Sequence, residues 1–571
     1  MLRTLLPRIR PRILDCLRTY NRRDFAADAI AGLTVGLVAL PLAMAFGIAS
    51  GVTPQAGIYT AIVGGFLVAV LGGSEVQVAG PTGAFVVIVA GIIAKHGLAG
   101  LSMVTMMAGV ILLVLGLTGL GTAIKFIPRP IVIGFTNGIA LLIASTQIKD
   151  FFGMSIASVP SEFIPRLRTL FGNLDTVQLA ATVLGAGSLA IIVFLPTITK
   201  RVPGSIVALF AGTAAVAIFK LPVETIGTRF GGIPQGLPAI DLPPFRPELI
   251  LPLLPSALTV ALLSAVESLL SAVVGDSMTG FRHSSNAELV AQGAANVAAP
   301  LFGGIPVTGA IARTATNVRI GARTPVASLL HALTLLAVIL VAAPLAAYVP
   351  LATLAAVLFV VAYNMGEWRE IGTIVRLDAA EIAVWVATFV LTVVADLTLA
   401  VEVGMALAAL LYIYRVAQTT TVSVVTKDYV EKGQPHILQD KRIPPYVIIL
   451  RIHGPFLFGT TDKLFEETAD LNSYAPIVLL RLRNMTAIDA TGLHALETFS
   501  ERLRKSGRTL LLCGARNQPD EFLQKGEFVE HIGKDNILPH VEAALQRAVE
   551  VYANFSGMGS ELAENLKKAK L

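Results

Sequence analysis

Two glycine- and proline-containing segments, one in each half of the chain, have the residue types needed to bind an anion. Leu71–Ala84 (LGGSEVQVAGPTGA) is echoed by Leu301–Ala310 (LFGGIPVTGA), and each lies within an apolar stretch. Paired interruptions of this kind indicate helices that begin in the middle of a membrane. The first N–H groups of such a helix are unpaired, and its dipole favours negative charge. The pattern predicts an anion site built from backbone N–H groups and one hydroxyl per segment: Thr82, Gly83, Ala84, Thr308, Gly309 and Ala310.

Two charged residues accompany these segments. Glu267 is the only charge between Leu253 and Val274, and Arg313 follows Ala310 by three residues. A charged residue at the centre of a membrane helix costs about 2.5–3.5 kcal/mol, so Glu267 should face a cavity or a partner, for which Arg313 is the obvious choice. One interpretation is a structural ion pair that joins two helices. The other gives Arg313 the role of attracting the anion and Glu267 that of a carboxylate that exchanges a proton.

A proline within the first apolar stretch gives a third candidate element. In Pro41–Phe46 (PLAMAF), an unwound helix would expose side chains to a substrate, whereas a kink without function is the alternative. We expect substrate contacts from Ala43, Met44, Phe46 and Phe85. The sequence lacks metal-ligand spacing, phosphate-binding loops and nucleophile elbows, so no metal, cofactor, ATP-driven transport or enzymatic activity is expected.

The composition places most of the chain in a bilayer. Hydrophobic residues make up 54% and charged residues only 14%, whereas soluble proteins carry about 25% charged residues. Fourteen apolar runs are predicted to be spans. The runs at 82–94 and 308–318 are too short to cross a bilayer, which takes ~20 residues, and are predicted to be half-helices. Seven runs per half require the second repeat to be inverted relative to the first.

The charge of the amino-terminal residues predicts how the chain is oriented in the membrane. The arginine-rich residues 1–25 predict a basic arm held in the cytoplasm by the positive-inside rule, and no nucleic-acid partner is expected. An even number of spans then returns the carboxyl terminus to the cytoplasm. The two cysteines, Cys16 and Cys513, exclude a disulfide framework. We predict a multi-pass protein of the cell (inner) membrane.

The sequence after the apolar part predicts a small α/β domain. Buried strands are expected at 446–453, 477–482 and 509–513, with helices at 461–472, 491–505 and 538–551. The predicted organisation is an arm (1–25), a transport domain (26–416, with repeats at about 26–220 and 250–416), a linker (417–437), the α/β domain (438–552) and a tail (553–571).

Several motifs, in order, resemble the sulfate permease (SulP) family over nearly the whole chain. They are ESLLSA (267–272), GFRHSSNAEL (280–289), AQGAAN (291–296), LFGGIP (301–306) and GAIARTATN (309–317). The carboxy-terminal domain resembles STAS domains, whose signature loop is here Ile488–Leu493 (IDATGL). In that loop Asp489 and Thr491 are either a helix N-cap or, as soluble STAS proteins imply, a phosphorylation site at Thr491.

The resemblance implies a 7+7 inverted repeat in which a core domain of spans 1–4 and 8–11 moves against a gate of spans 5–7 and 12–14. The anion would lie between the two half-helices and the first span. Sodium-coupled members lack an arginine at the position of Arg313, whereas proton-coupled sulfate carriers have the pairing of Glu267 and Arg313. Sodium coupling is therefore not expected. Many members have Gln and Tyr where this chain has Leu42 and Phe46, which leaves the substrate open.

These observations predict a secondary active transporter that takes up sulfate with a proton by alternating access. A C4-dicarboxylate (fumarate or succinate) or bicarbonate transporter on the same fold is the alternative, and an anion channel or sensor is a third hypothesis. The expected partners are the anion, the lipid bilayer, a second copy in a homodimer, and a cytoplasmic partner of the STAS domain.

Overall fold

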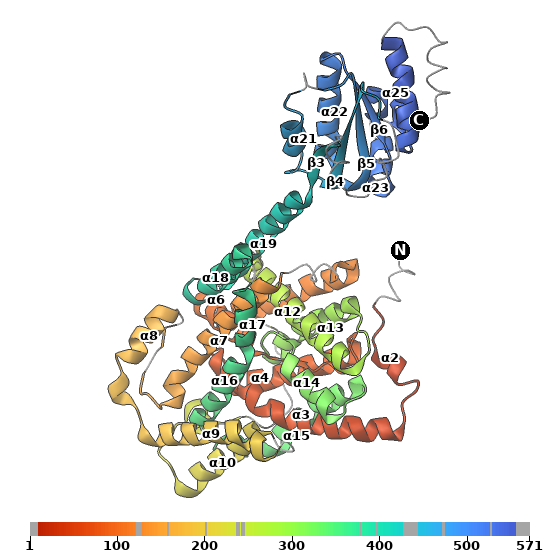
Figure 1. The fold of residues 1–571 in the computed structure, drawn as a ribbon. Helices are drawn as coiled ribbons and strands as arrows, with labels where there is room; N and C mark the ends of the chain where they lie inside the picture. Colours follow the sequence, from red (N-terminus) through yellow and green to blue (C-terminus); the bar gives the residue numbers. More distant parts are fainter. Residues whose placement is uncertain are drawn as a thin grey trace. The chain divides into compact units, whose positions relative to one another are not determined.

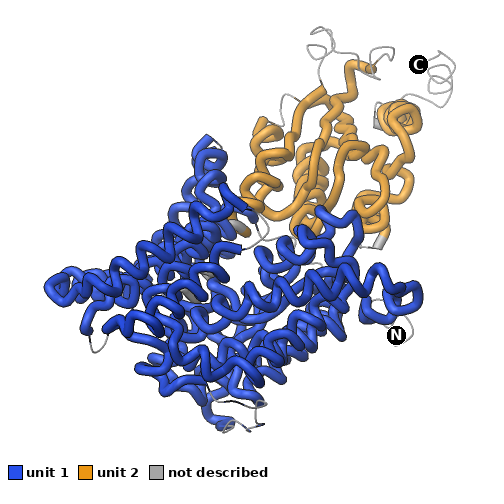
Figure 2. Tube along the Cα trace, turned by 90° about the horizontal axis from the view of Figure 1, so that it is seen from below, with its two compact units in different colours: residues 1–408 blue, residues 409–571 orange. Residues whose placement is uncertain are grey.

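The computed structural model describes residues 9–121, 128–156, 159–160, 162–199, 203–233, 235, 240, 242, 246–376, 378–395, 397–425, 443–470, 474–525 and 528–555. The chain forms two compact units, Met1–Ala408 and Ala409–Leu571 (Figure 2). The boundary lies inside a helix, α19 (Leu397–Thr419), close to the predicted end of the transport domain. Each unit has its own hydrophobic clusters.

The first unit is helical (Figure 1). Its first half contains α2 (Ile13–Cys16), α3 (Arg22–Ala49), α4 (Pro54–Tyr59), a π-helical turn (Thr60–Gly64), α5 (Gly65–Leu71), α6 (Gly83–Thr118), α7 (Arg129–Phe151), α8 (Phe163–Phe171), α9 (Leu179–Ile198), α10 (Gly204–Phe219) and α11 (Ile226–Phe230). The second half contains α12 (Ile250–Thr279), α13 (Ser285–Ala298), α14 (Ile311–Ile320), α15 (Pro325–Ala346), α16 (Leu351–Met365), α17 (Trp368–Ile374), α18 (Ala379–Val394) and α19. Among the described residues, eight helical segments are long and apolar enough to cross a membrane, and three shorter apolar helices accompany them.

Both predicted half-helices are present. In α6 the backbone leaves helical geometry at Gly97 (φ 68°, ψ −175°), which separates Gly83–His96 from the following span. A positive φ is readily adopted only by glycine, so this residue fixes where the half-helix ends. The second half-helix, α14, has 10 residues and ends at Gly321, which also has a positive φ.

Helix packing follows the inverted repeat. The first span of each repeat packs against the fourth span of the other, α3 against α15 and α12 against α6. The second span of each repeat also packs against the fourth span of the other repeat, α5 against α15 and α13 against α6. The remaining helices form a second group in which α7 packs on α16 and α18, and α9 on α10 and α16. These two groups correspond to the core and gate that the family resemblance implied.

Small residues allow the closest of these contacts. A Cβ at Gly109 of α6 would lie 2.8 Å from the Gly293 carbonyl oxygen of α13, and a Cβ at Gly293 would lie 2.7 Å from that of Gly109. Neither glycine can be enlarged without separating the helices. Close backbone approach at small residues is a main source of helix association in membranes.

Of the two alternatives left open at Pro41, unwinding of the first span is not seen. α3 is one helix of 28 residues that contains Pro41. A proline removes one intrahelical hydrogen bond, but neighbouring helices and small local adjustments make this tolerable in a membrane helix.

The second unit is an α/β domain with a five-stranded sheet in the order β3-β4-β5-β6-β7. Its strands are β3 (Thr421–Val425), β4 (Val447–Phe456), β5 (Ile477–Ile488), β6 (Thr509–Cys513) and β7 (Ile537–Leu538). β3 is antiparallel to β4, and the other neighbouring strands are parallel. One face is covered by α21 (Asp462–Glu467), α22 (Ala490–Lys505), α23 (Asn517–Lys525) and α24 (Phe528–Ile532), and the other by α25 (Val541–Phe555).

Two predicted boundaries differ from those in the structure. The predicted linker 417–437 is not a linker throughout, because Thr421–Val425 pair with β4 in the sheet. The predicted arm 1–25 already includes the start of α3 and the short helix α2. Residues 1–8, the rest of the linker from 426 and the tail from 556 lie outside the described residues.

Candidate functional site

The two duplicated segments meet in the structure. Ala79–Gly80 (β1) pairs antiparallel with Thr308–Gly309 (β2), so that Ala79 faces Gly309 and Gly80 faces Thr308. α6 then begins after Thr82 and α14 after Ala310, and neither N-cap residue bonds its helix through its side chain. Two uncapped helix starts therefore lie next to one short antiparallel pairing between the repeats.

A stripe of serines on α12 holds the second segment in place. Ser264 donates to the carbonyl oxygen of Val307 (2.9 Å), Ser268 shares a hydrogen bond with the Thr308 hydroxyl (2.9 Å), and Ser271 shares one with Thr314 (2.9 Å). The three serines are fully buried. Their spacing of four and three residues puts them on one helix face. This periodicity is visible in the sequence and could have identified them.

The donors predicted at Thr308, Gly309 and Ala310 are paired with protein groups in this structure. The Thr308 hydroxyl bonds the Ser264 carbonyl oxygen (3.0 Å), and the Gly309 N–H donates to the Ser268 hydroxyl (3.0 Å). The Ala310 N–H donates to the carbonyl oxygen of Val78 (2.8 Å). All three groups thus help to hold the second segment in place, and their contact with an anion stays a prediction.

The donors that remain at the second half-helix lie further along the chain. Among the described residues, the amide N–H groups of Ile311, Ala312 and Arg313 have no hydrogen-bond partner, as expected for the first turn of a helix. Ile311 is 41% exposed and Ala312 is also exposed, so this helix start is open to a ligand.

At the first half-helix the predicted backbone N–H donors have no hydrogen-bond partner, but side chains of other helices lie over them. The N–H groups of Gly83 and Ala84 have no hydrogen-bond partner among the described residues. A Cβ built on Gly83 would lie 2.5 Å from Met365 Sδ, 3.1 Å from Ile143 Cδ1 and 3.4 Å from Phe46 Cε1. Met365 of α16 and Ile143 of α7 were not predicted, because nothing in the sequence distinguishes them from lipid-facing residues.

Glu267 bonds the first half-helix. Its Oε2 accepts a hydrogen bond of 2.8 Å from the Thr82 hydroxyl at the start of α6. The carboxylate of repeat two is thereby held at the N-terminus of the half-helix of repeat one, where negative charge is favoured.

Arg313 of α14 also bonds the residues just before α6. It is 3% exposed, and its Nη2 donates to the carbonyl oxygen of Pro81. Its Nη1 has no hydrogen-bond partner. A Cβ on Gly80 would lie 2.8 Å from this nitrogen, and Gly80 has a φ of 152°. Both facts require glycine here, and they leave one guanidinium edge available to an anion.

The direct pairing predicted between Glu267 and Arg313 is absent, since no ion pair within 4 Å joins these two described residues. Instead each bonds one residue of the Pro81-Thr82 dipeptide. The physical reason is that Thr82 and Pro81 supply a donor and an acceptor at the helix start, so both charged groups find partners there.

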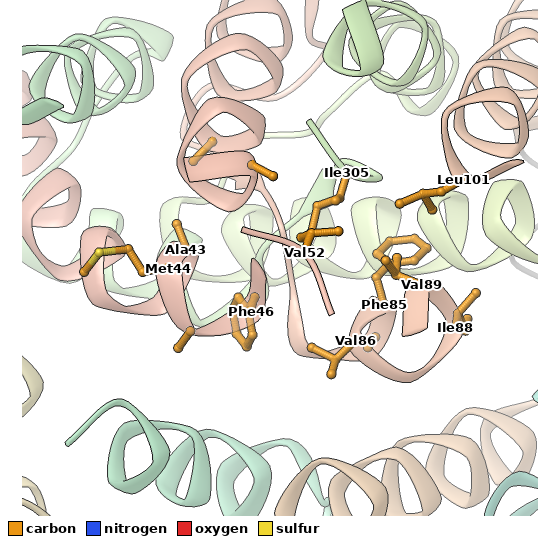
Figure 3. Packing of buried hydrophobic residues seen from close by; sticks show 14 of the residues in the cluster. Ala43, Met44, Phe46, Val52, Phe85, Val86, Ile88, Val89, Leu101 and Ile305 are labelled. Carbon is orange, nitrogen blue, oxygen red and sulfur yellow. The ribbon is translucent and has the colours of Figure 1, made fainter. Parts of the chain in front are cut away.

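The apolar residues predicted at the site divide into two groups. Phe46 contacts the position of Gly83, as described above. Ala43, Met44 and Phe85 are buried to 1% exposure or less in the main hydrophobic cluster. In Figure 3 the Phe85 ring lies beside Val89, and Met44 extends away from Phe46. All four residues therefore lie in the same core cluster, and Phe46 also contacts the position of Gly83.

A cavity of about 430 Å³ adjoins the first half-helix. It runs along Val86–His96 of α6 and is also lined by residues of α7, α8 and α18. Among these, the buried Arg166 donates to the Ser145 hydroxyl (2.9 Å). The cavity approaches the start of α6 within about one helical turn.

A second buried carboxylate was missed. Glu288 of α13 is fully buried and accepts hydrogen bonds from the Gly73 N–H (3.0 Å), Gln77 Nε2 (2.9 Å) and Gln292 Nε2 (3.1 Å). It fixes the segment that leads into β1. Glu288 lies in the quoted GFRHSSNAEL motif, so the signal was present in the sequence. No cluster of three or more metal-ligating side chains occurs in the described part of the chain.

In the second unit Asp489 is the N-cap of α22. Its Oδ1 accepts from the Gly492 N–H (2.8 Å) and its Oδ2 from the Phe458 N–H (3.0 Å). Thr491 lies in the first turn of the helix and is exposed. The structure thus supports the N-cap interpretation of Asp489, while phosphorylation of Thr491 stays a prediction.

The fold and motifs agree with known proteins. A profile of the Sulfate permease family matches residues 25–388, and a profile of the STAS domain matches residues 439–544. The chain therefore belongs to the sulfate permease family of membrane anion transporters, which confirms the family and fold predicted from the motifs.

Several relatives align over most of the chain. The putative sulfate transporter YvdB of Bacillus subtilis is 40% identical and covers 91% of this chain and 97% of its own. The bicarbonate transporter BicA of a Picosynechococcus strain is 32% identical over 92% of this chain and 95% of its own. The transmembrane domain of a cyanobacterial BicA superposes with a TM-score of 0.61 at 34% identity, covering 68% of this chain and 98% of that one. SLC26A9 superposes with a TM-score of 0.84 at 18% identity, covering 98% and 96%, and this likeness shows the fold.

Proposed function

We propose that this protein takes up sulfate together with a proton by alternating access. The observation that carries the proposal is the arrangement at the start of α6. Glu267 bonds Thr82, Arg313 bonds Pro81 with an Nη1 left unpaired, and the amides of Gly83 and Ala84 are free. A buried cationic donor beside two free amides is a site for an oxyanion.

Proton coupling follows from the position of the carboxylate. An anion that binds Arg313 Nη1 and the free amides brings negative charge next to Glu267. Protonation of Glu267 removes this repulsion, so anion and proton each favour binding of the other, which is thermodynamic linkage. The hydroxyl of Thr82 can turn to accept from the protonated carboxyl, since a hydroxyl both donates and accepts.

Alternating access is supported by the covering of Gly83. Ile143 and Met365 belong to α7 and α16, which pack within the second helix group, whereas Gly83 belongs to the first. An anion can reach the Gly83 amide only if these side chains move away. Displacement of one group against the other would uncover the site.

Bicarbonate is the second candidate substrate, because BicA proteins are among the relatives that span nearly the full chain. YvdB is named a putative sulfate transporter, which favours sulfate as the substrate of this protein. We further propose a location in the cell membrane with both termini in the cytoplasm, since residues 1–25 are rich in arginine. Assembly as a homodimer belongs to the same proposal.

The test is uptake into proteoliposomes of labelled sulfate, bicarbonate and succinate, at fixed internal pH and varied external pH. Sulfate uptake by the wild type should saturate and accelerate with an inward proton gradient. Glu267→Gln should retain sulfate exchange, because an amide oxygen can still accept from Thr82, but should lose the acceleration. Glu248→Gln, which removes an exposed carboxylate just before α12, is the matched control and should behave as wild type.

The outcomes separate the parts of the proposal. Full dependence on the gradient in Glu267→Gln would show that the carboxylate is structural. Saturable uptake of bicarbonate with no uptake of sulfate would show that sulfate is not the substrate and would favour bicarbonate instead.

A further inference from the structure

We propose that residues 10–23, the described part of the amino-terminal arm up to the start of α3, bind anionic phospholipids of the adjacent membrane leaflet. The contact would be made through Arg18, Arg22 and Arg23. All three are exposed, and within the described part of the chain their guanidinium groups have no hydrogen-bond or ion-pair partner. The proposal concerns a surface outside the transport site and does not depend on which anion is transported.

The acidic side chains around the arm do not neutralise these three arginines, because each acid already has another partner. An excess of positive charge therefore remains on the outer side of the arm. The partnered groups are Asp15 with Arg10 (2.9 Å), Glu75 with Arg12 (2.6 Å), Asp24 with Arg323 (2.9 Å) and the fully buried Asp28 with the Tyr20 hydroxyl (3.1 Å).

Two of the arginines stand where the helix itself does not favour them. Arg22 and Arg23 are the first two residues of α3, directly after the N-cap Asn21. The N-terminus of a helix carries partial positive charge, so cations are unfavourable there and anions are favourable. Local helix stability therefore does not account for these arginines. A negatively charged headgroup at this helix start would interact favourably with both arginines and with the helix dipole.

Exposed apolar side chains next to the arginines indicate that the anion belongs to a bilayer. Leu14 and Leu17 are 50% and 52% exposed, and their spacing of three residues puts them on one face. Phe25, also exposed, follows directly in α3. Segments that lie in a membrane interface combine arginines with leucines that enter the acyl boundary. A soluble phosphate compound would leave Leu14 and Leu17 in water, whereas a bilayer covers them.

The opposite side of the arm is attached to the first unit. The Arg12 N–H donates to the Gly72 carbonyl oxygen (2.9 Å), and Ile13 is buried. The short helix α2 lies at the edge of the unit and packs against α5 and α15 (Figure 1). A lipid bound to the outer side should therefore stabilise the folded protein, because ligands that bind only the folded state raise its stability. The melting temperature can report this binding.

The test uses the full-length protein in nanodiscs whose lipid is changed stepwise from phosphatidylcholine to phosphatidylglycerol at constant ionic strength. The melting temperature of the wild type should rise and then level off. Each arginine near an anionic surface strengthens binding about fivefold. Arg22→Gln combined with Arg23→Gln should therefore raise the half-saturating phosphatidylglycerol fraction at least tenfold, which flattens the rise. The matched control is Arg369→Gln combined with Arg376→Gln, at two exposed arginines in and after α17, and should keep the wild-type response.

Two further variants distinguish charge from apolar contact. Arg22→Lys combined with Arg23→Lys should keep most of the response, because the positive charge remains. Leu14→Ser combined with Leu17→Ser should raise the half-saturating fraction severalfold, and it opens no cavity because both side chains are exposed.

The behaviour in pure phosphatidylcholine separates lipid binding from a structural role. There the Arg22→Gln and Arg23→Gln variant should melt at or above the wild-type temperature, because cations are removed from a helix N-terminus. A lower melting temperature with an unchanged lipid response would show that these arginines are structural. A wild type that does not respond to phosphatidylglycerol, or a control that loses the response equally, would overturn the proposal. Stabilisation by inorganic phosphate that disappears in the Arg22→Gln and Arg23→Gln variant would assign the arginines to a soluble ligand and also overturn it.

Discussion

Alanine at Gly309 and alanine at Gly83 add the same methyl group to the two half-helix segments, but the structure predicts different consequences. A Cβ at Gly309 would collide with the Gln77 amide nitrogen and lie 2.9 Å from Gln77 Cδ and 3.0 Å from Ser268 Cα. The Ser268 atom is a backbone atom within α12, so it cannot move aside as the end of a side chain could. A Cβ at Gly83 meets only the ends of the Met365, Ile143 and Phe46 side chains.

The magnitudes follow from these contacts. Overpacking of a tight core costs about 1–3 kcal/mol. Displacing Gln77 also breaks its 2.9 Å hydrogen bond to the buried Glu288 carboxylate, worth about 1.5–3 kcal/mol. Gly309→Ala should therefore lower the free energy of unfolding by about 2.5–6 kcal/mol, or the melting temperature by roughly 5 °C or more. Gly83→Ala should stay within about 1 kcal/mol of the wild type, because flexible side chains can shift.

The assay compares melting temperature and sulfate uptake in the same preparations. Gly372→Ala, at a helical glycine of α17 with open space around it, is the control and should be neutral or slightly stabilising. Gly83→Ala should fold but transport slowly, since its methyl group occupies the place where Met365 and Ile143 close over the amides. Equal losses of stability in the two variants would refute this account of their different roles.

Two further predictions concern the parts outside the membrane. Asp489→Ala should lower the stability of the STAS domain by about 1 kcal/mol through loss of the α22 N-cap, whereas Thr491→Ala should be nearly neutral; equal effects in thermal unfolding would contradict the N-cap assignment. Burial raises the pKa of the Cys16 thiol to about 11, so below that pH the thiol is mostly protonated. Maleimide labelling of Cys16 at pH ~8.5 should then be about a hundredfold slower than that of a free thiol and should accelerate as the pH rises, and a rate equal to that of a free thiol would show the prediction wrong.

The sequence predicted the fold largely through the lengths of its apolar runs. The short runs at 82–94 and 308–318 identified α14 and the first part of α6, because a span has a minimum length and these segments fall below it. The carboxy-terminal strands followed from short apolar runs of the type found in buried strands. β3 was missed because it forms within a stretch whose strand character depends on pairing with β4.

At the site, residue identity was easier to predict than the direction of each hydrogen bond. Glu267 and Arg313 stood out as charges in apolar surroundings, and both lie at the start of α6. The commitment of Gly309 to Ser268 depends on how α12 packs against β2, which sequence does not contain. The sequence left two alternatives open at Pro41, because local propensity does not show how tertiary packing accommodates a proline within a helix.

The short pairing of β1 with β2 affects how the protein is synthesised and inserted into the membrane. Thr308 follows Gly80 by roughly 230 residues, so their backbone groups cannot pair until the chain as far as Thr308, about the first third of the second repeat, has left the ribosome. At 5–20 residues per second, that interval is roughly 10–45 s. During this time the nascent first repeat holds a helix start and a strand without their partners inside the bilayer. Insertion of the first repeat alone should therefore yield an intermediate that depends on the translocon or on chaperones, and the second repeat completes it.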